Sequence, residues 1–445
     1  MTVLRSSLKR AFLALGLPAL GALALGACSV PEAETGVAPP PPPVEEAELP
    51  PVEEPEAVVE KPVNKIALLL PLSGRNERVG RSLANAASMA LADLGETGVT
   101  LTAYDTAPGA SEAARRAMQD GAGLILGPLL AENATAVRSA VGGNSVPILS
   151  FSNDLSVAGN GVWLLGFQPE QSVRRVVQFA RAQGVSNFAA LVPEGVYGRR
   201  ASQAFLQAVN SAGGRVTAIE TYKRQKSALS ASVRRLTDYD ARAARAASGG
   251  VVRRDGTVRN VEDNMPPVSF DALMIADGGA IASEFLQPLE RFDAGPGKVR
   301  YLGTELWNAD PRVSQVEGLR GSWFASVPDG RFTDFARRFE NRFGGRPSRL
   351  ASLAYDAVLL AAGNAKKWTP GEPFPRSILA ERGGFVGLDG IFRFGTNGVA
   401  ERGMEVQQVA PGGAKVVAPA PTSFPSNKVS MLAPIMGVPA NDNGA

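Results

Sequence analysis

Histidine is absent from the 445-residue chain, and cysteine occurs once, at Cys28. Without histidine, the usual Ser/His and Cys/His catalytic pairs and the usual zinc sites cannot form, and a single cysteine forbids an internal disulfide. The sequence also lacks a Walker-type phosphate loop and a cluster of metal ligands. Most hydrolase chemistries are thereby disfavoured, and we predict a protein that is not an enzyme and needs neither a cofactor nor a metal.

The N-terminal residues 1–27 have the order of a secretory signal peptide. Three basic side chains precede an apolar run over 11–25, which is too short for a comfortable membrane span. The run ends in LGAC at 25–28, which resembles the lipobox of bacterial lipoproteins and implies cleavage before Cys28 and lipidation of its thiol. The alternative is an ordinary cleaved signal with an incidental cysteine. Because Ser29 follows, and not the aspartate typical of inner-membrane retention, we expect a periplasmic lipoprotein anchored to the outer membrane through Cys28.

Residues 28–63 are rich in proline and glutamate and are predicted to form a tether, since such a composition builds no core. At roughly 3.1 Å per residue, thirty residues of extended polyproline II span on the order of 100 Å. Residues 31–60 hold nine glutamates and no Lys or Arg. Removing these charges and the three positive ones of the signal from the net charge of +3 leaves +9. A basic domain in the periplasm suits anionic polymers, lipid headgroups or an acidic protein face and no nucleic acid; the alternative is a role in solubility alone.

From residue 64 onward, predicted strands and helices alternate at short spacing, which indicates an α/β fold with two doubly wound lobes. The predicted strands of the first lobe are 65–70, 99–104, 123–126 and 146–149, and its helices are 79–94, 111–119 and 131–140. The second lobe is predicted to have strands 187–192, 215–222, 271–276 and 299–302, and helices 171–183, 198–211 and 228–245. An insertion at 247–268, helices at 332–343 and 350–362, a hairpin at 384–394 and a disordered tail at 411–445 complete the prediction.

Several short motifs occur in an order that resembles the type I periplasmic binding proteins of the leucine/isoleucine/valine-binding family. They include IALLLPLSG at 66–74, ILGPL at 125–129, VPILS at 146–150, YLGTELW at 301–307 and GGFVGLDGIFRFGTNG at 383–398. The resemblance implies a Venus flytrap domain over 64–410, with three crossovers and a ligand cleft between the lobes. It places lobe 1 at about 64–166 and 303–370, and lobe 2 at about 167–302 and 371–410.

The same resemblance implies a site for a small amino-acid-like ligand, with Glu305 as the acid that binds the ammonium group and Tyr197 as an aromatic wall. The candidate ligand-binding residues are Ser73, Gly74, Ser150, Phe151, Ser152, Asn153, Tyr197, Asp277 and Glu305. One departure is clear: LLAE at 129–132 replaces the hydroxyl residues that grip the ligand carboxylate in amino-acid binders. In the alternative interpretation, the serines cap a turn, Tyr197 packs between elements and Glu305 pairs with an arginine.

Two functions remain in competition. FSND at 151–154 and GFQPEQ at 166–171, together with the lipobox and the tether, resemble the penicillin-binding protein activators. This resemblance implies a non-enzymatic activator of a penicillin-binding protein, which is a peptidoglycan synthase. The alternative is the solute-binding component of an amino-acid or amide ABC transporter, which the fold would serve equally well.

Overall fold

The computed structural model describes residues 62–142, 145–248, 265–308, 310–424 and 430–431. The predicted signal peptide, Cys28 and nearly all of the tether lie outside these residues, as does most of the predicted insertion at 247–268. Within the described ranges, no helix combines the length and the apolar character needed to cross a membrane.

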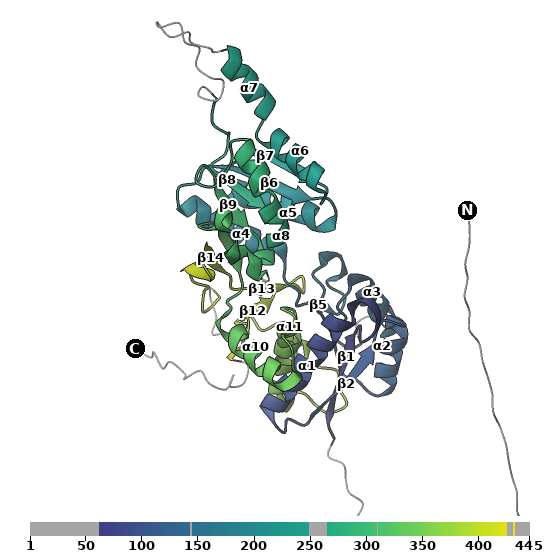
Figure 1. The fold of residues 1–445 in the computed structure, drawn as a ribbon. Helices are drawn as coiled ribbons and strands as arrows, with labels where there is room; N and C mark the ends of the chain where they lie inside the picture. Colours follow the sequence, from purple (N-terminus) through teal and green to yellow (C-terminus); the bar gives the residue numbers. More distant parts are fainter. Residues whose placement is uncertain (1–61, 143–144, 249–264, 309, 425–429, 432–445) are drawn as a thin grey trace, which may run out of the picture. The chain divides into compact units, whose positions relative to one another are not determined.

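The first sheet is parallel throughout, with strand order β2-β1-β3-β4-β5 (Figure 1). Its strand β1 (Asn64–Leu70) is almost continuously apolar because helices cover both faces of the sheet. Leu68 and Leu70 share a buried cluster with α1 (Glu77–Leu94) and α11 (Ala351–Gly363), whereas Ala67 and Leu69 pack toward the opposite helices. The remaining elements are β2 (Val99–Asp105), α2 (Ala110–Gln119), β3 (Leu124–Leu126), α3 (Ala131–Ala140), β4 (Ile148–Ser150) and β5 (Val162–Leu164).

The second sheet has the order β15-β14-β10-β9-β8-β6-β7. Strands β6 to β10 are parallel, and β14 and β15 add an antiparallel edge. Apolar clusters on both faces join this sheet to its helices. The elements are α4 (Pro169–Ala182), β6 (Asn187–Pro193), α5 (Val196–Ser211), β7 (Arg215–Tyr222), α6 (Lys226–Leu236), α7 (Tyr239–Ser248), β8 (Ala272–Ile275), α8 (Gly279–Glu284), α9 (Leu286–Arg291), β9 (Arg300–Gly303), β10 (Trp323–Ser326), β14 (Glu405–Ala410) and β15 (Gly413–Ala418).

A smaller sheet of order β13-β12-β11-β16 packs with α10 (Gly330–Phe343) and α11 against the first sheet. Phe385 and Phe392 face each other across its β11–β12 hairpin, with ring centroids 5.5 Å apart, and both are buried in the same cluster as β1. The other elements of this region are α12 (Arg376–Leu379), β11 (Phe385–Gly387), β12 (Gly390–Phe394), β13 (Ala400–Arg402) and β16 (Ser430–Met431).

The structure confirms the predicted α/β fold with two doubly wound sheets, but it corrects three details. The predicted helix 228–245 is interrupted at Asp238, whose φ of 48° ends α6 and separates it from α7. The lobe boundaries also differ, because the chain does not return to the first lobe near Gly303: β10 pairs with β9 and extends the second sheet. Residues 385–402, predicted in lobe 2, belong to the first lobe, because Phe385 and Phe392 are buried in the cluster of β1. The predicted disordered tail is also wrong in part, because β15 pairs with β14 from residue 413 to residue 418.

Candidate functional site

A cavity of about 730 Å³ opens among the loops that follow the carboxyl ends of strands in both sheets. These loops come after β3, β4, β6, β9 and β10. Most of the cavity wall is apolar, and its apolar side chains are Val79, Leu129, Leu130, Phe151, Phe167, Leu306, Val327, Leu350 and Met404. Its polar wall includes Asn153, Tyr197, Glu305, Asn308 and Arg349.

Ser73 and Gly74 are not among the residues that line this cavity. The Ser73 hydroxyl donates a 2.6 Å hydrogen bond to Asp105 Oδ2, which also lies at the carboxyl end of a strand. Gly74 has φ of +72° and begins a short 3-10 turn that leads into α1. The two residues therefore shape the entry of α1 and do not contribute to the cavity wall.

Of the four candidate residues at the end of β4 and just after it, two line the cavity and two bond to nearby backbone. Phe151 and Asn153 line the cavity, whereas Ser150 Oγ is fully buried and donates to the carbonyl oxygen of Pro128 at 2.8 Å. The Ser152 hydroxyl accepts from the backbone N–H of Asp154 at 3.1 Å. Both serine hydroxyls thus stabilise local backbone, as the alternative interpretation of the sequence holds.

Tyr197 and Glu305 meet at the cavity wall, although 108 residues separate them in the sequence. The Tyr197 hydroxyl donates to Glu305 Oε1 at 3.1 Å, and the Ser172 hydroxyl donates to Glu305 Oε2. Burial raises the pKa of Glu305, and these two hydrogen bonds oppose that rise. Burial and the neighbouring Glu305 charge raise the pKa of Tyr197. Glu305 is therefore held by hydroxyl groups from α4 and α5, and it forms no ion pair with an arginine of the described residues.

Asp277 lies outside the set of residues that line the cavity. Its Oδ2 accepts from the Tyr222 hydroxyl at 2.8 Å and from Arg224 Nε at 2.7 Å, and its backbone oxygen accepts from Trp307 Nε1 at 2.9 Å. These contacts fix the loop after β8 against the loop after β9. Asp277 therefore contacts the loop that carries Glu305 and does not itself line the cavity.

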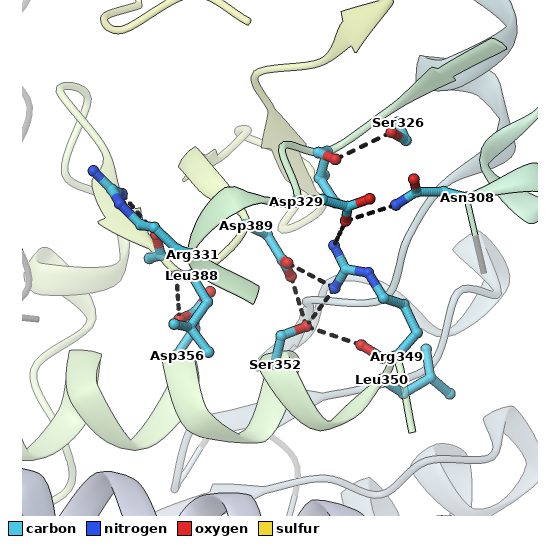
Figure 2. A network of polar contacts seen from close by, with 12 residues as sticks. Asn308, Ser326, Asp329, Arg331, Arg349, Leu350, Ser352, Asp356, Leu388 and Asp389 are labelled. Carbon is cyan, nitrogen blue, oxygen red and sulfur yellow. Dashed lines mark hydrogen bonds and ion pairs between the residues drawn. The ribbon is translucent and has the colours of Figure 1, made fainter. Parts of the chain in front are cut away.

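Arg349 is a residue of the cavity wall that the sequence did not reveal (Figure 2). Its guanidinium group donates to Asp389 Oδ1 at 2.7 Å, to Ser352 Oγ at 3.0 Å and to Asp329 Oδ1 at 3.3 Å. The same group lies 4.1 Å from the centroid of the Phe332 ring, a cation–π distance. No local pattern could signal this site, because the two carboxylates lie 20 and 40 residues away.

Two further ionisable side chains, Asp356 and Arg402, are buried near Asp389, which Arg349 binds. Asp356 Oδ1 accepts from the backbone N–H of Leu388 at 2.8 Å, while its Oδ2 has no partner among the described residues. Arg402 donates to the carbonyl oxygen of Leu165 at 2.8 Å and lies 4.0 Å from Asp389 Oδ2. Since Leu165 follows β5 and Arg402 ends β13, this cluster ties together two segments where the chain crosses between the sheets.

Asp356 gives a pH-dependent prediction. Burial, followed by the charge of Asp389, raises its pKa to about 7. A pKa raised in the folded state means that ionisation costs stability, so the free energy of unfolding falls as the pH rises from about 4 to about 7. Asp356→Asn keeps the acceptor for Leu388 and removes that cost. We expect the free energy of unfolding of the variant to exceed that of the parent by about 4 kcal/mol at pH 8, with the difference vanishing near pH 4.

Urea unfolding at pH 4 and pH 8 measures this difference. Asp334→Asn is the matched control, because the Asp334 side chain is 71% exposed. We expect the control to follow the parent at both pH values. An Asp356→Asn variant that is less stable than the parent at pH 8 would show that the carboxylate is needed in its ionised form.

With this geometry established, the sequence matches the family described as periplasmic binding protein over residues 64–414. The chain belongs to the periplasmic binding protein family, and its fold is of type I. It is similar to the penicillin-binding protein activator LpoA of Photobacterium profundum, with 27% identity over 169 residues. These residues are 37% of this chain and 27% of that protein, so the match spans about a quarter of the length of that relative.

Solved structures show the same fold. The C-domain of LpoA (YraM) from Haemophilus influenzae, a regulator of PBP1A, has a TM-score of 0.57 at 20% identity; the match covers 80% of this chain and 100% of that one. A putative branched-chain amino acid ABC transporter from Rhodospirillum rubrum has a TM-score of 0.64 at 19% identity, with coverage of 80% and 100%. Activators and transporter components therefore share this architecture, and the fold alone does not separate them.

Proposed function

We propose that this chain is a periplasmic lipoprotein, anchored to the outer membrane through Cys28, that activates a penicillin-binding protein by direct contact. Membership of the periplasmic binding protein family and the similarity to LpoA support the proposal. The tether at 28–63, at roughly 3.1 Å per residue, supplies reach on the order of 100 Å toward a synthase in the inner membrane. Activation of this kind needs no chemistry, because binding that favours one conformation of the synthase is sufficient.

The observation that carries the proposal is the state of the polar groups around the cavity. Glu305, the expected ammonium acceptor, already accepts hydrogen bonds from Ser172 and Tyr197. Ser150 donates to Pro128, and Leu130 stands at the start of α3, where an amino-acid binder needs hydroxyl groups. A zwitterion would have to share Glu305 with two hydroxyl donors at one end and would find apolar side chains at the other. This arrangement favours a domain that has the fold of a solute-binding protein but binds its protein partner outside the cavity.

The rate of glycan polymerisation by a purified penicillin-binding protein tests the proposal. We expect the rate to rise several-fold when the full chain is added in excess, and to return to its basal value when the chain is heat-denatured beforehand. The chain alone should polymerise nothing. An unchanged rate at saturating concentrations of the chain, with several penicillin-binding proteins tried, would overturn the proposal.

A second candidate function is solute binding for an amino-acid or amide transporter. It is favoured by the cavity itself, whose 730 Å³ falls within the range of about 300–1,000 Å³ that small-molecule sites occupy. The largely apolar wall, with Tyr197 and Glu305 at its polar part, would suit a solute with one charged group and an apolar body. A receptor of this kind would show ligand-dependent thermal stabilisation.

A further inference from the structure

A separate groove of about 490 Å³ lies on the first lobe and is lined by residues from the start of α1 and the end of α10. These two helices contact each other (Figure 1). We call it the basic groove, because four of its lining residues are Arg75, Arg78, Arg81 and Arg346. All four are exposed. The cavity described above and this groove share no lining residue.

The positive charge of the basic groove is largely uncompensated. Its single acidic lining residue is Glu77, which is already paired with Arg81 at 2.7 Å. Arg75, Arg78 and Arg346 make no hydrogen bond or ion pair with any residue in the described part of the chain. Three guanidinium groups without a partner in the described part of the chain therefore gather around one groove.

The stability of α1 does not explain why these arginines lie where they do. Arg75 and Arg78 lie at the amino end of α1, an 18-residue helix, where the helix dipole disfavours cations. The Asn76 side chain at this end makes no capping hydrogen bond. Glu77 is an acidic residue of the first turn, but it is paired with Arg81. Arg75 and Arg78 therefore depart from the charge preference of a helix start, and such departures are typical of functional surfaces. A bound anion would reverse both effects, because it would satisfy the arginines and the positive end of the helix together.

The lining of the groove narrows the choice of anion. Phe339 and Phe343 belong to the lining, with ring centroids 4.8 Å apart, and provide an aromatic floor beneath the charged rim. A concave site with such a floor fits an apolar side chain flanked by carboxylates, whereas a flat bilayer surface does not enter a groove. We propose that the basic groove binds an extended acidic peptide segment of a partner protein, with carboxylates on its free arginines and an apolar side chain on its aromatic floor. The inference does not rest on the identity of the partner proposed above.

Binding of a defined peptide to the full chain tests this inference. The probe is a fluorescein-labelled octapeptide with glutamates on both sides of one leucine, and its glutamine counterpart is the matched peptide. The variant is the triple substitution Arg75→Gln, Arg78→Gln and Arg346→Gln. The control, with the same change of charge, is Arg116→Gln, Arg174→Gln and Arg382→Gln, three exposed arginines outside the groove.

We expect the groove variant to bind the acidic peptide at least tenfold more weakly than the parent, and the control to differ by less than twofold. The glutamine peptide should bind the parent at least tenfold more weakly than the acidic one. Equal loss in both triple variants would overturn the inference, because it would indicate a general effect of net charge. Binding of the parent to phosphatidylglycerol vesicles that is lost in the groove variant, with no binding of the acidic peptide, would overturn it in favour of a membrane surface.

The melting temperature shows whether the groove variant binds weakly only because it is less stable. Because Arg75 and Arg78 oppose the dipole of α1, the groove variant should melt at the same temperature as the parent or slightly above it. Synthase activation is measured independently of this peptide assay, so the groove proposal and the proposed function fail separately.

Discussion

Replacing Arg349 by methionine is expected to lower the free energy of unfolding by about 3–5 kcal/mol, because it removes a guanidinium partner from a fully buried carboxylate. Asp389 is fully buried, and its Oδ1 is bonded to Arg349 at 2.7 Å. Asp329 would also lose a charged donor, and burial already raises its pKa. Methionine fills a similar volume against the Phe332 ring, so the loss reports mainly on charge pairing and not on a cavity.

Equilibrium urea unfolding at pH 7 measures this loss. Arg337→Met is the matched control, because the Arg337 side chain is 73% exposed and its ion pair with Asp334 is equally open to solvent. A change of no more than about 0.5 kcal/mol is expected there. If the two substitutions cost the same, the buried network would not hold the crossover region together.

Deleting residues 31–60 is expected to abolish activation of the synthase in cells while leaving the domain folded and able to bind the purified synthase. The physical reason is reach, because the described fold begins near residue 62 and a lipid on Cys28 would otherwise hold it close to the outer membrane. The measurements are growth of cells that depend on the activator, and capture of the synthase by the purified variant.

A linker of equal length made of glycine and serine is the informative control. A flexible chain of thirty such residues has a mean end-to-end distance of only about 30 Å, against roughly 90 Å for extended polyproline II. We expect this variant to retain part of the activity in cells. Full activity of the deleted form would contradict a role for reach, and loss of binding by the purified deleted form would contradict a tether that acts only as a spacer.

Elements whose signal is local were predictable from the sequence. The boundaries predicted for β1, α3 and β7 lie within one residue of those observed. The apolar run of β1 is the clearest of these signals, because both faces of this strand are buried. The crossovers were not predictable in the same way. β10 has only four residues and follows short 3-10 turns, so nothing local indicates that it pairs with β9. The edge strand β15 was missed because its sequence, GAKVVA, lies in a region rich in alanine and proline.

The candidate site also contains residues that the sequence predicted and residues that it did not. The order of motifs predicted that Tyr197 and Glu305 belong to one site, and they are hydrogen-bonded to each other. The hydroxyl of Ser172, which completes the shell of Glu305, comes from a helix 133 residues away and had no signal. Arg349 and its carboxylate partners likewise depend on contacts between segments that are distant in the sequence. Local patterns therefore identify which residue types belong to a site. Tertiary contacts decide whether those side chains are already hydrogen-bonded within the protein or available to a ligand.

We propose that the fold serves a protein partner and not a small solute. The most direct measurement pairs a thermal-shift screen with a capture experiment, both on the purified chain. The screen uses amino acids, small amides and cell-wall peptides, and the capture uses penicillin-binding proteins. We predict a captured synthase and no shift with any solute. A shift of several degrees with one small solute, and no synthase captured, would contradict the proposed function and identify a solute receptor of a transporter.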